Sequence, residues 1–267
     1  MATAAGFAIQ THQLSRSFGG MLALDGLTLE VPEGSFFGFL GPNGAGKSTT
    51  INILTGLLAP SGGSARVLGY DVETQGLDIK RRIGVVPDGL HLFERLTGEE
   101  HLRFVGEAYG LAPAEARRRG GQLLEAMDLS GDADKLVSGY SHGMRKKLAL
   151  SCALIHEPRL LFLDEPFEGV DAVATRELRE LLQKLVASRG TTVFLTSHVL
   201  EVVEKLCTHV GILHQGRLAA SGTLDELSRG PGGTPRSLEE LFLDTVGATR
   251  DDAAAGLDWL THERGPA

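Results

Sequence analysis

The sequence has 267 residues, of which 42% are hydrophobic and 22% charged, and its formal net charge is −8 at pH 7. This size is typical of one large domain, or of a core domain with a smaller lobe, and the composition is that of an ordinary globular protein. The acidic balance argues against a general nucleic-acid-binding protein, because such proteins usually carry a basic surface. We therefore expect no nucleic acid among its partners.

Targeting and redox signals are weak. Cys152 and Cys207 lack the spacing of metal ligands, so two reduced, buried thiols are expected. The first residues do not combine a basic segment with an apolar stretch, which argues against a secretory signal. No apolar run approaches the roughly 18 residues that a membrane span requires. If the function involves a membrane, we expect another chain to cross it.

Short apolar runs separated by turn residues open the chain. They predict strands at Phe7–Leu14 and Leu27–Val31, followed by a strand at Phe36–Leu40 that runs directly into a glycine-rich loop. From Lys47 to Leu58 the apolar spacing becomes helical, and Ala59–Gly63 is expected to end that helix.

The middle of the chain is predicted to be helical, and strands then alternate with helices. The expected middle helices are Thr97–Tyr109, Ala114–Met127 and Met144–His156. The expected later strands are Leu160–Leu163, Thr192–Thr196 and Val210–His214, and the later helices Ala172–Ser188 and Leu200–Leu206. Apolar strands alternating with helices indicate an α/β fold with a parallel sheet covered on both faces. We expect a helical lobe, about 90–157, inserted in a nucleotide-binding core.

The C-terminal part is predicted to be a small appendage. Gly230–Pro235 is typical of a linker, which we place at about 229–236. Ser237 lies three residues before Glu240, so a short capped helix is expected over Ser237–Val246. The last residues of the 237–267 segment are expected to form a loosely held tail.

The glycine-rich loop fits the pattern G-x-x-x-x-G-K-[ST] between a strand and a helix. Its backbone N–H groups would surround the phosphates of ATP, Lys47 would reach the β- and γ-phosphates, and Ser48 would ligate Mg²⁺. The predicted ATP-binding residues of this phosphate loop are Gly41, Pro42, Asn43, Gly44, Ala45, Gly46, Lys47, Ser48 and Thr49. A chance match is the alternative in a glycine-rich chain, and the strand and helix on either side argue against it.

Three polar residues follow later apolar strands. Asp164 and Glu165 end the strand beginning at Leu160. Asp164 is suited to bind Mg²⁺, and Glu165 is suited to activate the attacking water as a general base. His198 follows the strand Thr192–Thr196, at the edge where open α/β sheets bind ligands. A lone histidine is more often structural, and this position favours a contact with the γ-phosphate or the attacking water.

The segment Tyr140–Lys147 precedes and opens a predicted helix. Ser141 and Gly143 mark its exposed N-terminus, and Arg145, Lys146 and Lys147 follow where the helix dipole disfavours cations. The segment is either a solvated basic face or a place where an anion docks.

With the phosphate loop, Ser141–Gly143, Asp164-Glu165 and His198 in this order, the chain resembles an ATP-binding cassette (ABC) nucleotide-binding domain over about 7–228. The resemblance implies a P-loop NTPase core with an antiparallel β region at the N-terminus. It implies a dimer in which one subunit's segment contacts the other subunit's ATP. The residues implied to act on the partner's ATP are Ser141, His142, Gly143, Met144 and Asp171. Phe18 resembles the aromatic residue that stacks on adenine, and an ordinary strand-end hydrophobic residue is its alternative.

Two features depart from the family's pattern. His142 and Met144 replace a glycine and a glutamine in the segment Tyr140–Met144, which we call the signature segment. Asp88 stands where the family has a glutamine that approaches Mg²⁺ and couples the site to the membrane subunit. A carboxylate still suits Mg²⁺, so Asp88 is a third predicted metal ligand beside Ser48 and Asp164.

The resemblance to separately encoded bacterial exporter cassettes implies an ATPase that powers a polytopic transmembrane subunit, with export favoured over import. The chain would then be cytoplasmic and peripheral on the inner face of the membrane, paired with itself or with a related cassette. Leu90, Leu92, Phe93 and Leu96 are either core of the helical lobe or a docking patch for that subunit. The alternative function is a soluble ABC ATPase acting on a protein or on ribosomes. A small-molecule P-loop kinase leaves the signature segment and His198 unexplained.

Overall fold

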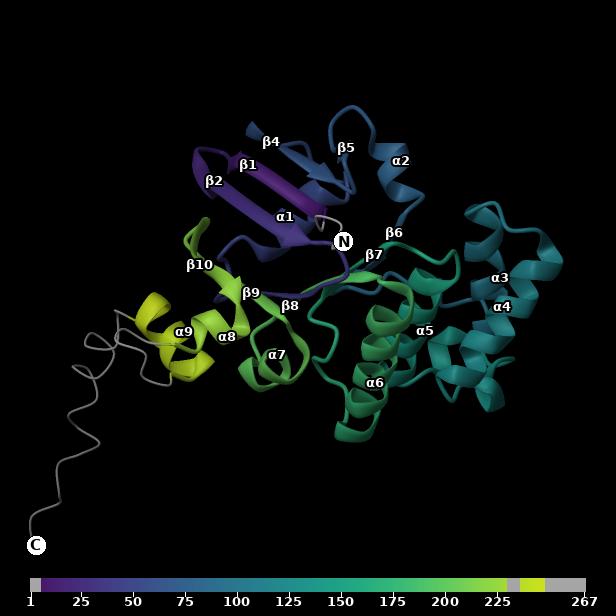
Figure 1. Cartoon of the computed structure of the whole chain (residues 1–267). Coiled ribbons are helices and arrows are strands. Elements are labelled where there is room, and N and C mark those ends of the chain that lie inside the picture. Colours follow the sequence, from purple (N-terminus) through teal and green to yellow (C-terminus); the bar gives the residue numbers. More distant parts are fainter. Residues whose placement is uncertain (1–5, 230–235, 248–267) are drawn as a thin grey trace, which may run out of the picture.

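The structure, a computed structural model, describes residues 6–229 and 236–247 (Figure 1). The expected linker Gly230–Pro235 and the tail beyond Gly247 lie outside the described residues. None of the described helices combines the length and the apolarity needed to cross a bilayer.

A six-stranded sheet forms the centre of the molecule, in the order β10-β9-β3-β8-β7-β6. Its strands are β3 (Phe36–Leu40), β6 (Ile83–Val86), β7 (Leu160–Asp164), β8 (Thr192–Ser197), β9 (His209–His214) and β10 (Arg217–Thr223). All neighbouring pairs are parallel except β9 with β10. Every residue of β3, β7 and β8 is buried, as expected for strands covered on both faces. The predicted parallel α/β core is confirmed.

A second, antiparallel sheet has the order β2-β1-β4-β5. It consists of β1 (Phe7–Phe18), β2 (Met21–Pro32), β4 (Gly62–Val67) and β5 (Tyr70–Asp71). Helix α1 (Lys47–Leu54) lies between the two sheets (Figure 1). Its buried side chains join one apolar cluster with residues of β1, β2 and β3, which fixes the start of α1 against the end of β3.

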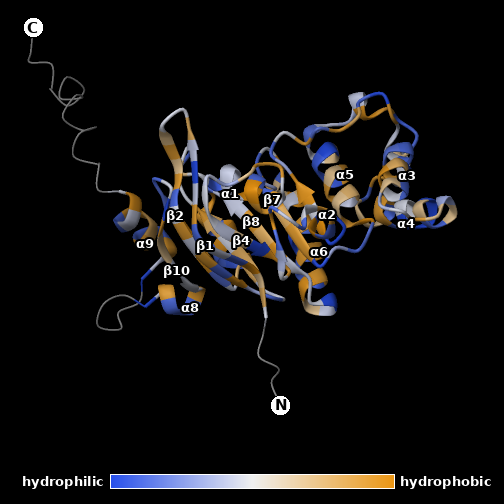
Figure 2. Ribbon diagram, turned by 90° about the horizontal axis from the view of Figure 1, so that it is seen from above, coloured by the Kyte–Doolittle hydropathy of each residue, from blue (hydrophilic) through white to orange (hydrophobic). Residues whose placement is uncertain are grey.

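The remaining helices form a lobe and cover the central sheet. The lobe holds α3 (Gly98–Ala108), α4 (Pro113–Ala126), short 3-10 turns at Ser130–Asp132 and Val137–Gly139, and α5 (His142–Leu154). Seen from above, α3, α4 and α5 lie to one side of the apolar sheets (Figure 2). The other helices are α2 (Gly76–Lys80), α6 (Ala172–Arg189), α7 (Leu200–Leu206), α8 (Leu224–Leu227) and α9 (Leu238–Val246). Side chains of α6, α7 and α9 join the lobe's apolar residues in a second cluster.

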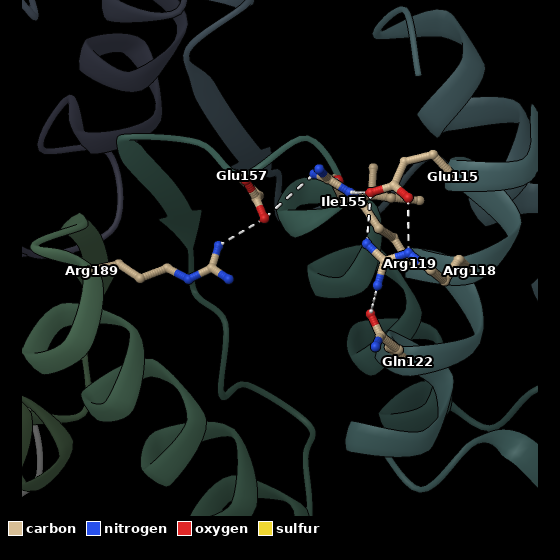
Figure 3. Close-up of polar contacts among 7 residues, drawn as sticks. All are labelled: Glu115, Arg118, Arg119, Gln122, Ile155, Glu157 and Arg189. Atoms are coloured by element: carbon tan, nitrogen blue, oxygen red, sulfur yellow. Dashed lines mark hydrogen bonds and ion pairs between the residues drawn. The ribbon is translucent and has the colours of Figure 1, made fainter. Parts of the chain in front are cut away.

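An ion-pair bridge joins the lobe to the core (Figure 3). Arg119 of α4 lies 3.5 Å from Glu157 and donates to the carbonyl oxygen of Ile155 at 3.2 Å. Glu157 also lies 3.1 Å from Arg189 at the end of α6. Because these side chains are partly exposed, the bridge adds orientation rather than much stability. A cleft of about 600 Å³ lies beside it, at the amino ends of β7 and β8.

The structure differs from the expected elements at several boundaries. The helix predicted to reach Leu58 ends at Leu54, because Thr55 donates its hydroxyl back to the Ile51 carbonyl and Gly56 follows at φ 69°. The signature helix begins at His142 rather than Met144, with Ser141 as its cap. The strands β4, β5, β6 and β10 and the short helices α2 and α8 were not expected. Cys152 and Cys207 are free thiols, as predicted; Cys207 is buried, as expected, whereas Cys152 is only partly buried.

Candidate functional site

The phosphate loop connects β3 to α1 in a conformation that requires glycine. Gly44 and Gly46 have φ values of 81° and 109°, which side-chain-bearing residues rarely adopt. A Cβ atom on Gly46 would lie 2.5 Å from the carbonyl oxygen of Ala23. A Cβ atom on Gly41 would lie 2.4 Å from the carbonyl oxygen of Leu213. Strand β2 and strand β9 therefore hold the loop from two sides.

Lys47, the first residue of α1, turns back over this loop. Its side chain is only 7% exposed, and Nζ donates to the carbonyl oxygen of Gly41 at 2.7 Å. Nζ also lies 3.9 Å from Oε1 of Glu165. The ammonium group therefore stands between the glycine-rich loop and a carboxylate from a different strand.

Hydrogen bonds across the ends of β7 and β8 orient the Asp164-Glu165 pair. Thr196 Oγ1 donates to Oδ1 of Asp164 at 2.6 Å and accepts from the backbone N–H of Glu165 at 3.0 Å. Asp164 is buried at the tip of β7. Glu165 has a φ of 47°, and its carboxylate contacts Lys47 and His198, whereas that of Asp164 accepts from Thr196. The two neighbouring carboxylates therefore occupy different places.

His198 completes the group from the end of β8. Its Nδ1 lies 3.1 Å from Oε2 of Glu165, and its backbone N–H donates to the same oxygen at 3.3 Å. The imidazole is half exposed, so its outer edge faces solvent. Glu165 thus lies between Lys47 and His198.

A cleft of about 740 Å³ brings most of the predicted residues together at the carboxyl ends of the parallel strands. The predicted residues that line it are Gly41, Pro42, Asn43, Gly44, Gly46, Lys47, Ser48, Thr49, Asp88, Asp164, Glu165 and His198. Ala45 is buried beneath the loop and does not line the cleft. We call this space the nucleotide cleft.

Comparison with known proteins decides which family this site belongs to. The sequence profile of the ABC transporter family matches residues 24–168. The chain belongs to the ABC transporter family. It is the ATP-binding subunit of such a transporter and an ATPase. The predicted ABC ATPase fold is confirmed.

Several relatives of this ABC ATPase are similar over most of their length. The daunorubicin/doxorubicin resistance ATP-binding protein DrrA of Streptomyces peucetius is 41% identical, covering 84% of this chain and 68% of DrrA. The linearmycin resistance ATP-binding protein LnrL of Bacillus subtilis (strain 168) is 36% identical, covering 89% of this chain and 78% of LnrL. A solved structure of the ATP binding subunit of an ABC transporter has a TM-score of 0.83 and 36% identity. It matches 89% of this chain and 99% of that one.

The signature segment of this ABC ATPase lies away from the nucleotide cleft of its own chain. Ser141 caps α5 by accepting from the backbone N–H of Met144 at 3.2 Å. His142, Gly143 and Met144 form the first turn, and none of these residues lines the cleft. The cleft therefore contains the nucleotide-loop and strand-end residues of one chain without its signature segment.

Asp171 and Phe18 also lie outside the cleft. Asp171 caps α6 by accepting from the backbone N–H groups of Val173 and Ala174 at 3.0 Å each. The bond from Ala174 is the main reason that the pKa of Asp171 lies below its ordinary value. Phe18 ends β1 with its ring 47% exposed, and the Arg16 guanidinium carbon lies 4.6 Å from the ring centroid. One face of the Phe18 ring is thus already covered by a cation.

Sequence reasoning missed Ala23, Glu168 and Phe242, which also line the cleft. Glu168 is only four residues from Asp164, and its negative charge in the same turn is the local signal that predicts it. Phe242 belongs to α9, which the sequence presents as an appendage. Helix α9 packs on α7 and β9, and this long-range packing brings the ring to the cleft. No local signal predicts it.

The donor set fits Mg²⁺ bound together with phosphates. No group of three or more His, Cys, Asp or Glu side chains within residues 6–229 and 236–247 is arranged to hold a metal. Mg²⁺ in nucleotide sites usually takes one or two protein carboxylates and completes its shell with phosphate oxygens and water. Ser48, Asp88 and Asp164 all line the cleft and offer oxygen donors of this kind.

Proposed function

We propose that this ABC ATPase powers export through a separate polytopic transmembrane subunit. The convergence of Lys47, Glu165 and His198 in one cleft carries the assignment of hydrolysis to this site. The names of DrrA and LnrL, both resistance ATP-binding proteins, support export as the direction of transport. The cassette spans about 7–228, with the helical lobe at about 90–157 and the short C-terminal helix at the end.

The phosphate loop binds the triphosphate. Its backbone N–H groups and the positive end of α1 face the anion, and Lys47 neutralises phosphate charge. Ser48, Asp164 and Asp88 would hold Mg²⁺, which supplies further neutralisation of charge on the phosphates. Phe18 offers the exposed face of its ring to adenine.

Glu165 acts as the general base for the attacking water. Its carboxylate reaches the cleft from the end of β7, where the Lys47 ammonium lies 3.9 Å from Oε1 and His198 Nδ1 lies 3.1 Å from Oε2. His198 steadies the γ-phosphate with the half-exposed edge of its ring. Positioned acid–base groups of this kind typically contribute 10²–10⁴-fold to a rate.

A second cassette completes the site. Ser141, His142, Gly143 and Met144, together with Asp171, act on the nucleotide held by the partner cassette. This assignment is supported by their position outside the cleft of their own chain. Two cassettes facing each other head to tail then enclose two nucleotides, in a homodimer or in a pair of related chains.

The transmembrane subunit docks beside the lobe, and the cassette stays on the inner face of the membrane. Leu90 and Leu92 are partly buried and pack against the apolar core, which favours a place in the lobe for these two. Phe93 is 54% exposed and stands edge-on to the exposed Phe104, with ring centroids 5.5 Å apart. These two rings form the apolar patch that we assign to the membrane subunit.

Replacing Glu165 by glutamine tests the base assignment. The variant keeps the size of the side chain and loses its basicity, so ATP binding persists while hydrolysis slows. We expect a phosphate-release rate lowered by about 10²-fold or more, and an ATP-dependent dimer visible by size-exclusion chromatography. Glu125→Gln, on the exposed face of α4, is the matched control. Undiminished turnover in Glu165→Gln would refute the assignment.

Purification from membranes tests the transport assignment. The tagged chain is expected to co-purify with a polytopic membrane protein, and Phe93→Ser combined with Phe104→Ser is expected to abolish that association without lowering ATP binding. A fully active complex that contains no membrane protein contradicts the proposal.

A further inference from the structure

Lys146 is a buried cation that lies behind the nucleotide cleft. It is on α5, two residues after the signature segment, and is only 4% exposed. Its aliphatic stem lines a small apolar space with Leu163 and Phe167, and it is not among the residues that line the cleft. Burying an ammonium group is costly unless it is paired, so its place calls for a specific partner.

That partner is the backbone of Glu165. Lys146 Nζ donates to the carbonyl oxygen of Glu165 at 2.6 Å, and within the described residues it makes no other hydrogen bond. Burial lowers the pKa of Lys146, and the negative charges of Glu168 and Asp88 oppose that shift. A charged donor to a carbonyl makes a stronger hydrogen bond than a neutral donor does.

The Glu165 peptide needs such a hold because its conformation is strained. Its φ of 47° is uncommon for a residue with a side chain, and Pro166 follows, which disfavours compact backbone conformations at Glu165. Strained backbone persists only where the surroundings enforce it. The N–H of Glu165 donates to Thr196 Oγ1 at 3.0 Å. Besides Lys146, the only donor to the Glu165 carbonyl oxygen within the described residues is the backbone N–H of Glu168, at 3.3 Å.

We propose that Lys146 is a positioning residue that holds the Glu165 peptide, and through it the carboxylate, in the orientation required for hydrolysis. The inference rests on the role of Glu165 proposed above. Ser141 caps α5 and Lys146 lies on it. Lys146 therefore also connects Glu165 to the signature segment, which we assign to the partner's nucleotide. A shift of α5 on dimer closure is thereby transmitted to the Glu165 backbone.

A positioning role and a purely structural role predict different results for Lys146→Met. Lys146→Met removes the cost of burying an ammonium group and leaves the Glu165 carbonyl oxygen without its main donor. These two effects on stability oppose each other. A structural role predicts loss of stability and of ATP binding together with turnover. A positioning role predicts loss of turnover alone, since the phosphate loop is untouched.

The experiment measures phosphate release, affinity for a fluorescent ATP analogue and melting temperature on the full chain. For Lys146→Met we expect the turnover number to fall about 10- to 100-fold, with analogue affinity within about threefold and the melting temperature little changed, because the two opposing effects on stability largely cancel. Lys184→Met, an exposed lysine on α6, controls for the substitution and is expected to match the wild type.

Two outcomes overturn the proposal. One is turnover in Lys146→Met within about twofold of the wild type; the other is a lowered melting temperature together with weakened analogue binding. Glu165→Gln is measured in parallel. If that variant retains full turnover, the role of Glu165 fails, whereas an inactive Glu165→Gln beside a fully active Lys146→Met contradicts the Lys146 assignment alone.

Discussion

The ring of His142 lies directly over Gly169. A Cβ atom placed on Gly169 would lie 3.0 Å from Cδ2 of His142, and Gly169 has a φ of 66°. The imidazole therefore fills the space that the small residue leaves open, between the first turn of α5 and the turn that leads to Asp171. In this chain the histidine of the signature segment links two segments that we assign to the partner's nucleotide.

Glu115, a partly exposed residue of α4, has a pKa well below its ordinary value. Hydrogen bonds from Arg118 first, and then from Arg119, lower its pKa from 4.5 to about 2 (Figure 3). A lowered folded-state pKa means stability that is present above about pH 4.5 and lost as pH falls toward about 2. We expect the melting-temperature difference between wild type and Glu115→Gln to shrink over that range. A difference that does not vary with pH contradicts this account.

Individual site residues were predictable where a local pattern encodes them. Lys47, Asp164 and Glu165 follow strands within recognisable motifs, and His198 follows a strand that the apolar run reveals. Lys146 and Phe242 were not assigned their places, because each depends on which face of a helix packs against distant residues. The spacing of residues along the chain does not reveal that packing.

At the scale of elements, two adjacent glycines of α4 have different surroundings, because only one of them faces α3. Gly120 is buried, and a Cβ atom there would lie 3.3 Å from Cβ of Leu102, whereas a Cβ atom on Gly121 would meet nothing within 4 Å. The first glycine permits close packing of the helices. The second only weakens α4, since glycine costs about 0.5–1 kcal/mol in a helix interior relative to alanine.

The two glycines make a matched pair of substitutions. We expect Gly121→Ala to raise the free energy of unfolding by about 0.5–1 kcal/mol. We expect Gly120→Ala to gain less or to destabilise, because Leu102 must move. Urea unfolding of both variants measures the difference, and an equal gain at both positions would show that the packing of α4 on α3 is not as tight as described.

Element boundaries were predictable only where local signals end an element. Strand β3 was predicted to the residue because a glycine-rich loop follows it. Strand β4 was missed because Gly62 and Gly63 look like a turn, and pairing with β1 at Ser15↔Gly62 and Thr11↔Ala65 makes them part of a strand. Pairing with β2 likewise extends β1 to Phe18, well past the predicted end at Leu14.

At the scale of the whole molecule, nucleotide binding and folding are linked. A ligand that binds only the folded chain at 100 times its dissociation constant adds about 2.7 kcal/mol of stability. We expect a non-hydrolysable ATP analogue with Mg²⁺ to raise the melting temperature, and chelation of Mg²⁺ to reduce the gain. Lys47→Ala is expected to lose most of the shift and Lys184→Ala to keep it. A full shift in Lys47→Ala contradicts the assigned phosphate contact.

The cleft is assembled from the ends of β3, β7 and β8, with Asp88 following β6, and these parallel strands pair residues far apart in the chain. Parallel pairings close long loops and therefore form slowly. No short stretch of the chain contains the complete set of groups. During refolding, the ability to bind nucleotide should thus return only with the last sheet pairings, after helices and the N-terminal hairpin have formed. Recovery of ATP binding during refolding therefore measures how much of the chain has folded completely.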